Sequence, residues 1–168
     1  MEESYHAAHI KSVYSWGASM VSFACYNTPC GFVSIGTEDG QVVSLRRMDA
    51  AVPSAPSPLS DLTALQLLEY FEGNRRIFDI PLNPAGTPFQ KAVWQALGEI
   101  PYGQTRTYAQ IAAAIGRPGA ARAVGMACHR NPVWIIIPCH RVIGANSALT
   151  GYAGGLEMKR TLLELEKT

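Results

Sequence analysis

A run of five apolar residues at positions 133–137 constrains the fold more than any other feature of the sequence. The run is far too short to span a membrane, and prolines at 132 and 138 bound it, so it needs burial in a core. It leads directly into Cys139, His140 and Arg141. We therefore expect the core to hold a cysteine rigidly, with a histidine next to it in the chain.

Cys139 has two interpretations. A free cysteine most often acts as a small hydrophobic residue of the core, and composition alone favours that view. A thiol also becomes a strong nucleophile when a nearby base removes its proton, and His140 is such a base. The adjacent His140 and Arg141, with the Asn131-Pro132 turn upstream, favour a reactive site.

Charge is distributed unevenly along the 168 residues. The net charge is +1, but residues 1–86 carry 5 Lys/Arg and 9 Asp/Glu, whereas residues 87–168 carry 9 and 4. Any nucleic-acid surface is therefore expected in the second half. The 48% hydrophobic and 16% charged residues are typical of a globular protein. The length permits one ordinary domain or two small ones.

The four cysteines are too few for a disulfide-stapled scaffold. No stretch has the length of a membrane span, and the acidic Glu2 and Glu3 do not fit a signal peptide. We expect a cytoplasmic protein, or a nuclear one in a eukaryote, with no membrane partner.

The first half predicts a small α+β domain over residues 1–86, closed by a linker at 82–86. Strands are expected at 21–23, 31–35 and 41–45, with a hairpin signal at Glu38-Asp39-Gly40. Ser60 is expected to cap a helix whose buried face carries Leu62, Leu65, Leu68 and Phe71. A further strand is expected at 77–80. Residues 1–19 show no clear period.

The second half, residues 87–168, predicts a helical domain. Thr87-Pro88-Phe89-Gln90 forms a capping box, followed by a helix that buries Val93, Trp94 and Leu97. Thr107 is expected to cap a helix at 108–115. This helix and another at 118–130, joined by a tight turn, resemble a helix-turn-helix. A last helix is expected at 156–167.

Small residues are frequent in the predicted helix at 118–130. Small side chains let a helix backbone approach another surface closely, and that surface is either DNA or the protein's own core. The sequence leaves both open. The residues are Ala120, Ala121, Ala123, Gly125 and Ala127.

Three blocks identify a family. They are Pro138-Cys139-His140-Arg141-Val142-Ile143-Gly144, the preceding Arg122-Ala123-Val124-Gly125 with Asn131-Pro132, and the following Gly151-Tyr152-Ala153-Gly154-Gly155-Leu156. Together they resemble the O6-alkylguanine-DNA alkyltransferases, over nearly all of residues 60–168. The resemblance implies a ribonuclease-H-like N-terminal domain, a winged-helix-like C-terminal domain and no cofactor.

The resemblance also implies a reaction. An alkyl group would pass from O6 of guanine in DNA to Cys139 in a single turnover, and activity on O4 of thymine stays open. His140 would take the thiol proton through a water, oriented by Glu166, and Asn131 would hold the loop. Tyr108 would donate to the base, although a core aromatic is the simpler interpretation of that residue. Val142, Tyr152 and Ala153 would line the base pocket.

The implied partner is double-stranded DNA containing O6-alkylguanine, bound by a monomer through the minor groove. The alkylated base must leave the helix to reach a buried sulfur. Arg122 would fill the gap, although a lone arginine on a helix is usually only solvated. Ala121 and Gly125 would permit the close approach, and Arg106, Arg117 and Arg130 are candidates for phosphate contact.

The sequence departs from the family pattern at two positions. Cys128 adds a second thiol that could react, and Ser147 replaces a glycine common in relatives. At the latter position, Asn146 could supply the positive φ. Zinc is not expected, because His6, His9, Cys25 and Cys30 have no regular ligand spacing.

Three other functions compete with alkyl transfer. A non-catalytic alkyltransferase-like protein that binds alkylated DNA would require an unreactive Cys139. A winged-helix regulator that senses alkylation would be expected to have a sizeable extra regulatory domain, which the 168 residues do not contain. A cysteine hydrolase would need a thioester intermediate that water can break, whereas alkyl transfer gives a thioether.

Overall fold

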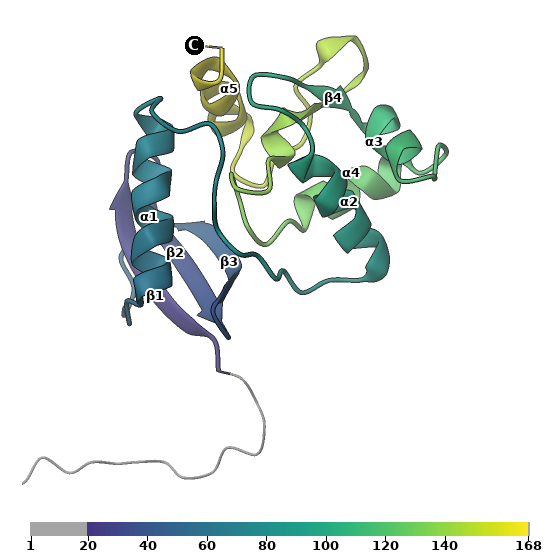
Figure 1. The fold of residues 1–168 in the computed structure, drawn as a ribbon. Helices are drawn as coiled ribbons and strands as arrows, with labels where there is room; N and C mark the ends of the chain where they lie inside the picture. Colours follow the sequence, from purple (N-terminus) through teal and green to yellow (C-terminus); the bar gives the residue numbers. More distant parts are fainter. Residues whose placement is uncertain (1–19, 168) are drawn as a thin grey trace, which may run out of the picture.

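The computed structural model describes residues 20–167. Three antiparallel strands form a sheet in the order β1-β2-β3, and one helix, α1, lies across a face of that sheet (Figure 1). The three predicted strands are present, and Asp39 and Gly40 have the positive φ angles of a tight hairpin turn, 48° and 74°. The elements are β1 (Ser22–Thr28), β2 (Gly31–Glu38), β3 (Gln41–Met48) and α1 (Pro58–Phe71).

The rest of the chain is mainly helical and lies beside the sheet (Figure 1). A short parallel pair, β4 with β5, and two 3₁₀ turns connect its helices. The α+β class predicted from the sequence is confirmed. Within residues 20–167, no helix combines the length and the apolar character that crossing a membrane requires. The elements are α2 (Pro88–Gly98), β4 (Arg106–Thr107), α3 (Tyr108–Ala114), α4 (Ala121–His129), η1 (Cys139–Arg141), β5 (Val142–Ile143), η2 (Ala145–Ser147) and α5 (Leu156–Leu165).

Local capping signals set the starts of α2 and α3 as predicted. Thr87 accepts a hydrogen bond from the backbone N–H of Gln90, whose side chain closes the capping box, and Thr107 and Gln110 repeat the arrangement. The predicted buried stripe of α2 is also present, because Val93, Trp94 and Leu97 are all buried.

The prediction for α1 was wrong in two respects. Its N-cap is Ser57, and Ser60 is the third helical residue, which completes the capping box. Leu62, Leu65 and Leu68 are 43%, 53% and 37% exposed, whereas the buried face carries residues 63, 67 and 70. A constant spacing of three drifts around a helix of 3.6 residues per turn, so the leucine stripe does not follow one face.

Three other boundaries differ from prediction. Residues 77–80 form no strand: Ile77 lies in a bend and residues 78–80 are irregular, while Leu82 makes an isolated bridge to Val42. Helix α4 begins at Ala121 because residues 117–120 form a turn closed by the Ala120 N–H on the Arg117 carbonyl. Helix α5 ends at Leu165, two residues earlier than expected.

Strand β3 joins the sheet to the segment that leads to Cys139. The Leu45 N–H donates to the Pro132 carbonyl at 2.8 Å, and the Trp134 N–H donates to the Leu45 carbonyl at 3.0 Å. Buried residues of the sheet, α1, α2 and α5 form one continuous hydrophobic core with this segment. The core therefore fixes the backbone just before the predicted nucleophile.

Candidate active site

Cys139 opens the 3₁₀ turn η1 and is 4% exposed. The predicted burial of the preceding run is confirmed for Val133, Ile135 and Ile137. Ile135 has a φ of 69°, a conformation that a β-branched residue rarely adopts. Cys139–Arg141 form a 3₁₀ turn, so the segment at the thiol is not extended. The turn places Cys139 and His140 by local backbone hydrogen bonds instead of by strand alternation.

Asn131 connects both ends of the apolar run to the thiol. Its Oδ1 accepts a hydrogen bond from the Val133 N–H at 2.9 Å, and its Nδ2 donates to the Ile137 carbonyl at 2.8 Å. The same Nδ2 lies 3.2 Å from Sγ of Cys139. Asn131 is 1% exposed, so these bonds lie inside the core. The side chain holds the loop and supplies a donor to the sulfur.

His140 and Glu166 form a fully buried pair. Nε2 of His140 lies 2.7 Å from Oε1 of Glu166, immediately after α5. Because an ionised carboxylate only accepts hydrogen bonds, Nε2 carries the proton and Nδ1 keeps its lone pair. Nδ1 is buried and has no hydrogen-bond partner among residues 20–167. Burial lowers the pKa of His140, so the imidazole is a neutral base at neutral pH.

The Glu166 carboxylate receives hydrogen bonds from four residues. Besides His140, Tyr70 donates its hydroxyl at 2.7 Å, Arg141 donates Nε at 2.8 Å, and Gly103 donates its backbone N–H at 3.2 Å. Burial alone would raise the pKa of Glu166, but the hydrogen bonds from His140 and Arg141 outweigh it and lower the pKa to about 2. Glu166 is therefore a permanent anion at neutral pH.

The thiol itself rests in the protonated form. Burial raises the pKa of Cys139, while the hydrogen bond from Asn131 and the positive charge of Lys159 oppose that rise. A buried thiol with a raised pKa needs a base before it can attack. The free Nδ1 of His140 is the base that the neighbouring residue offers.

Lys159 is a site residue that the sequence analysis missed. It is completely buried, and its Nζ donates to the carbonyls of Val142 at 2.5 Å and Thr150 at 2.9 Å. Lys159, Leu162 and Glu166 follow one another at spacings of three and four on the buried side of the last helix. Charged residues on the apolar face of a helix are the signal that could have identified this site.

Four predicted residues meet at a cavity of about 420 Å³ beside α4. Tyr108, Ala121, Arg122 and Gly125 all line this cavity. A Cβ atom on Gly125 would lie 3.7 Å from the Tyr108 ring, an ordinary van der Waals contact, so the ring packs directly over this position of α4. The Tyr108 hydroxyl donates to the Thr150 carbonyl at 3.1 Å. Cys139 is not among the residues that line the cavity.

Of the other predicted pocket residues, Val142 contacts Lys159 and Tyr152 contacts Trp134. The Val142 carbonyl accepts from Lys159, and the Tyr152 ring packs 6.1 Å from the Trp134 ring. The Tyr152 hydroxyl is buried and has no hydrogen-bond partner in the described part of the chain. Ala153 is exposed. The residues are near the site, but none of them lines the cavity beside α4.

The predicted DNA-contacting arginines lie at the surface of the helical part. Arg122, Arg117 and Arg130 are exposed, and Arg106 is half-buried, with its guanidinium on the Thr105 carbonyl and the Gln104 side chain. Arg122 projects from the first turn of α4, beside the cavity.

The environment of Cys128 disfavours the thiolate form. It is buried on α4, and desolvation together with the nearby Cys139 raises its pKa to about 12. Asn146 has the expected positive φ of 58°, and Ser147 has one of 59°. Residues 20–167 contain no group of three or more metal-ligating side chains placed around one ion. His6 and His9 lie outside the described residues.

Comparisons with known proteins agree with this geometry. Residues 88–168 match the family model described as 6-O-methylguanine DNA methyltransferase, DNA binding domain. A methylated-DNA–protein-cysteine methyltransferase of Mycobacterium tuberculosis is 46% identical over 155 residues, which cover 89% of this chain and 94% of the relative. A protein of the same name from Methanosarcina acetivorans is 63% identical over 101 residues, which span 60% of this chain and 65% of the relative's length.

A solved structure adds the fold. The crystal structure of Mycobacterium tuberculosis OGT in complex with DNA superposes with a TM-score of 0.79 at 46% identity, and it covers 86% of this chain and 92% of that one. Fold and site thus define an α+β protein that matches a methyltransferase DNA-binding domain and has a buried cysteine next to a buried histidine–glutamate pair. The chain belongs to the methylated-DNA–protein-cysteine methyltransferase family. The predicted family, whose members transfer a methyl group from DNA to a protein cysteine, is confirmed.

Proposed function

We propose that this chain repairs DNA by moving an alkyl group from O6 of guanine to Sγ of Cys139. The observation that carries the proposal is the His140–Glu166 pair, which leaves Nδ1 of the residue next to the thiol as a free, neutral base. In the reaction, His140 takes the thiol proton through one water. The thiolate then forms the S–C bond while the C–O6 bond breaks, and the guanine oxygen leaves with the bonding electrons and is protonated.

Glu166 and Asn131 prepare the two reacting groups. The carboxylate fixes the His140 ring and stabilises the imidazolium that forms when the proton arrives. The Asn131 amide donates to the sulfur and so favours the thiolate over the thiol. A thioether is the product, and no water-labile bond remains on the enzyme. Each molecule therefore reacts once.

The base pocket opens by movement of the segment that carries Thr150 and Tyr152. Cys139 is 4% exposed, and the Tyr108 hydroxyl and Lys159 both hold the Thr150 carbonyl. An alkylated base that enters would take the Tyr108 hydroxyl as a donor in place of Thr150. Val142 and Ala153 would then contact the base edge through their backbones, with Tyr152 as a wall.

Helices α3 and α4 are the proposed DNA-binding unit, of the helix-turn-helix type within a winged-helix-like domain. Arg122 would fill the stack that the extruded guanine vacates, entering through the minor groove. Ala121 and Gly125 would allow the close approach, and Arg106, Arg117 and Arg130 would contact phosphates.

We further propose a division into a ribonuclease-H-like domain at residues 1–86 and a DNA-binding domain at 87–168. The protein would act as a monomer, in the cytoplasm or, in a eukaryote, the nucleus. Activity on O4 of thymine can be tested in the assay described next, with duplex DNA that contains O4-methylthymine.

Mass spectrometry tests the proposed function directly. Incubation with duplex DNA containing O6-methylguanine should add one methyl group to the peptide that bears Cys139, and Cys139→Ser should abolish the gain. Cys128→Ser is the matched control and should retain it. Repeated turnover would instead indicate a hydrolase, and tight binding of the lesion without a mass gain would indicate an alkyltransferase-like binding protein.

A further inference from the structure

Tyr70 links the sheet-and-helix part of the fold to the proposed proton relay. It lies on α1, is completely buried, and is 96 positions away from Glu166 in the chain. Its hydroxyl donates to Oε1 of Glu166 at 2.7 Å, the same oxygen that accepts from Nε2 of His140 at 2.7 Å. One carboxylate oxygen therefore holds both the phenol and the imidazole.

Packing does not require the Tyr70 hydroxyl. The ring contacts the rings of Phe71, Phe78 and Tyr102 at centroid distances of 5.6, 5.4 and 6.2 Å. A phenylalanine would make the same aromatic contacts. A buried phenol oxygen costs free energy unless it is hydrogen-bonded, and Glu166 is its partner. The role of the Tyr70 hydroxyl is therefore to donate a hydrogen bond to the Glu166 carboxylate.

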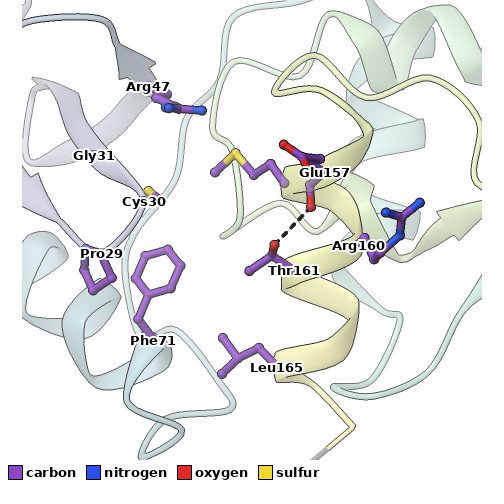
Figure 2. Close-up of a pocket in the computed structure, with 10 residues that line it drawn as sticks. Pro29, Cys30, Gly31, Arg47, Phe71, Glu157, Arg160, Thr161 and Leu165 are labelled. Carbon is purple, nitrogen blue, oxygen red and sulfur yellow. Dashed lines mark hydrogen bonds between the residues drawn. The ribbon is translucent and has the colours of Figure 1, made fainter.

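One chain neighbour of Tyr70 and one of Glu166 line a cleft. A cavity of about 720 Å³ runs between the β1–β2 turn and α5, and its lining includes Cys30, Phe71, Met158 and Leu165. Figure 2 shows Phe71 and Leu165, the chain neighbours of Tyr70 and Glu166, on opposite sides of this cleft. Tyr70 and Glu166 themselves do not line the cleft, and their hydrogen bond is a buried polar link between α1 and the end of α5.

We infer that Tyr70 is a positioning residue for the proposed alkyl transfer, because its hydroxyl fixes the Glu166 oxygen that orients His140. The inference rests on the proposed function. By donating to Oε1, Tyr70 disperses the negative charge of Glu166, so the carboxylate pulls less strongly on the His140 proton. Removal of the hydroxyl leaves a more basic carboxylate and a more easily protonated His140. The other titratable groups around the relay are Arg141, Tyr102 and Lys159.

The test compares Tyr70→Phe with Tyr26→Phe. Tyr26 is a matched control because its hydroxyl is also hydrogen-bonded, to Ser60 and Asp61 of α1 at 2.7 and 2.8 Å, and does not touch Glu166. The rate of methyl transfer from duplex O6-methylguanine and the rate of Cys139 alkylation by iodoacetamide are measured against pH, with peptide mapping to separate Cys139 from the other thiols. Thermal unfolding of each variant reports stability separately.

In Tyr70→Phe, transfer at neutral pH should fall roughly fivefold, the effect of one net hydrogen bond. The acid limb of both pH profiles should also move to higher pH, whereas Tyr26→Phe should leave both profiles in place. Adding Tyr70→Phe to Glu166→Gln should have no further effect on the profile, because the hydroxyl acts through the carboxylate.

Unchanged pH profiles in a folded Tyr70→Phe protein would overturn the inference, as would an equal shift in Tyr26→Phe. The proposed function fails by a different result, namely a wild-type protein that gains no methyl group. The iodoacetamide profile still measures the effect of Tyr70 on Cys139 in that case, so the two failures are distinguishable.

Discussion

Nε2 of His140 lies 2.7 Å from Oε1 of Glu166, and their side chains are 0% and 1% exposed. The same carboxylate carries the buried Arg141 guanidinium at 2.8 Å. Glu166 is therefore both a part of the proposed relay and the counterion of a buried cation.

Glu166→Gln should destabilise the protein by about 3–5 kcal/mol, because it leaves Arg141 buried without its counterion. Urea unfolding at pH 7 measures the loss. Glu164→Gln is the control: Glu164 pairs with Lys167 at the surface, where an ion pair contributes about 0–1 kcal/mol. Equal losses in the two variants would contradict the role assigned to the buried carboxylate.

Acid should destabilise the protein through Glu166. Its pKa is lowered from 4.5 to about 2 in the folded protein, so its contribution is fully present above pH 4.5 and is lost as the pH falls towards 2. The expected loss is on the order of 3 kcal/mol. The lowered pKa of His140 acts in the same direction below its ordinary value of 6.5. Urea unfolding at pH 7, 5, 4 and 3 should show a steady decline, and a flat profile between pH 5 and 3 would be inconsistent with this account.

Asn131→Asp should make Cys139 less reactive. The change keeps an oxygen for the Val133 N–H but removes the Nδ2 donor and places a negative charge beside the sulfur. The pKa of the thiol should rise, so alkylation of Cys139 by iodoacetamide should require a higher pH. Asn83→Asp, at an exposed position, is the control. A thiol profile that stays in place would show that Asn131 only supports the loop.

Gly103→Ala should destabilise the fold more than Gly116→Ala. Both glycines have a positive φ, 75° and 70°, so both substitutions incur backbone strain of about 1–2 kcal/mol. Only at Gly103 would the new Cβ meet a neighbour, the backbone carbonyl oxygen of Glu166, at 2.8 Å. Thermal and urea unfolding measure the difference, and transfer by Gly103→Ala should be slower because Glu166 shifts. Equal losses of stability in the two variants would mean that the backbone at Glu166 moves away from the new Cβ at little cost in free energy.

Arg122→Ala should separate the chemistry from the DNA interaction. Transfer from free O6-benzylguanine should stay within about twofold of the wild-type rate, whereas transfer from duplex DNA should fall at least tenfold, because extrusion of a base costs a few kcal/mol. Lys91→Ala on α2 is the control for the loss of one surface charge. An equal fall on both substrates would exclude a role for Arg122 in base extrusion.

Local features of the fold could be predicted, and features that depend on distant residues could not. The caps at Thr87 and Thr107 depend on bonds three residues apart, and both were correct. The buried face of α1 depends on which side of the helix meets the sheet, and the leucine spacing pointed to the wrong side. Residues 77–80 have a strand-like composition but find no strand to pair with.

The residues of the site also divide into those that local sequence indicates and those that depend on distant parts of the chain. The motif around Cys139 indicated the thiol, the histidine and Asn131 as neighbours, and the family resemblance added Glu166. The donors Tyr70 and Gly103, which complete the environment of Glu166, come from positions 96 and 63 residues away. No local pattern encodes such contacts. Lys159 was detectable in principle, as a charge on the buried face of α5.

The outer edge of strand β3 links the integrity of the site to resistance against aggregation. An open sheet edge is a template for pairing with other chains, and here the backbones of residues 81–83 and 132–134 occupy that edge. One of the two shielding segments, residues 132–134, also leads into the turn at Cys139. A distortion that displaces residues 132–134 from β3 would move the turn at Cys139 and expose the backbone edge of β3 at Leu45 together. Loss of the reactive geometry and exposure of an aggregation-prone edge would then have the same structural cause.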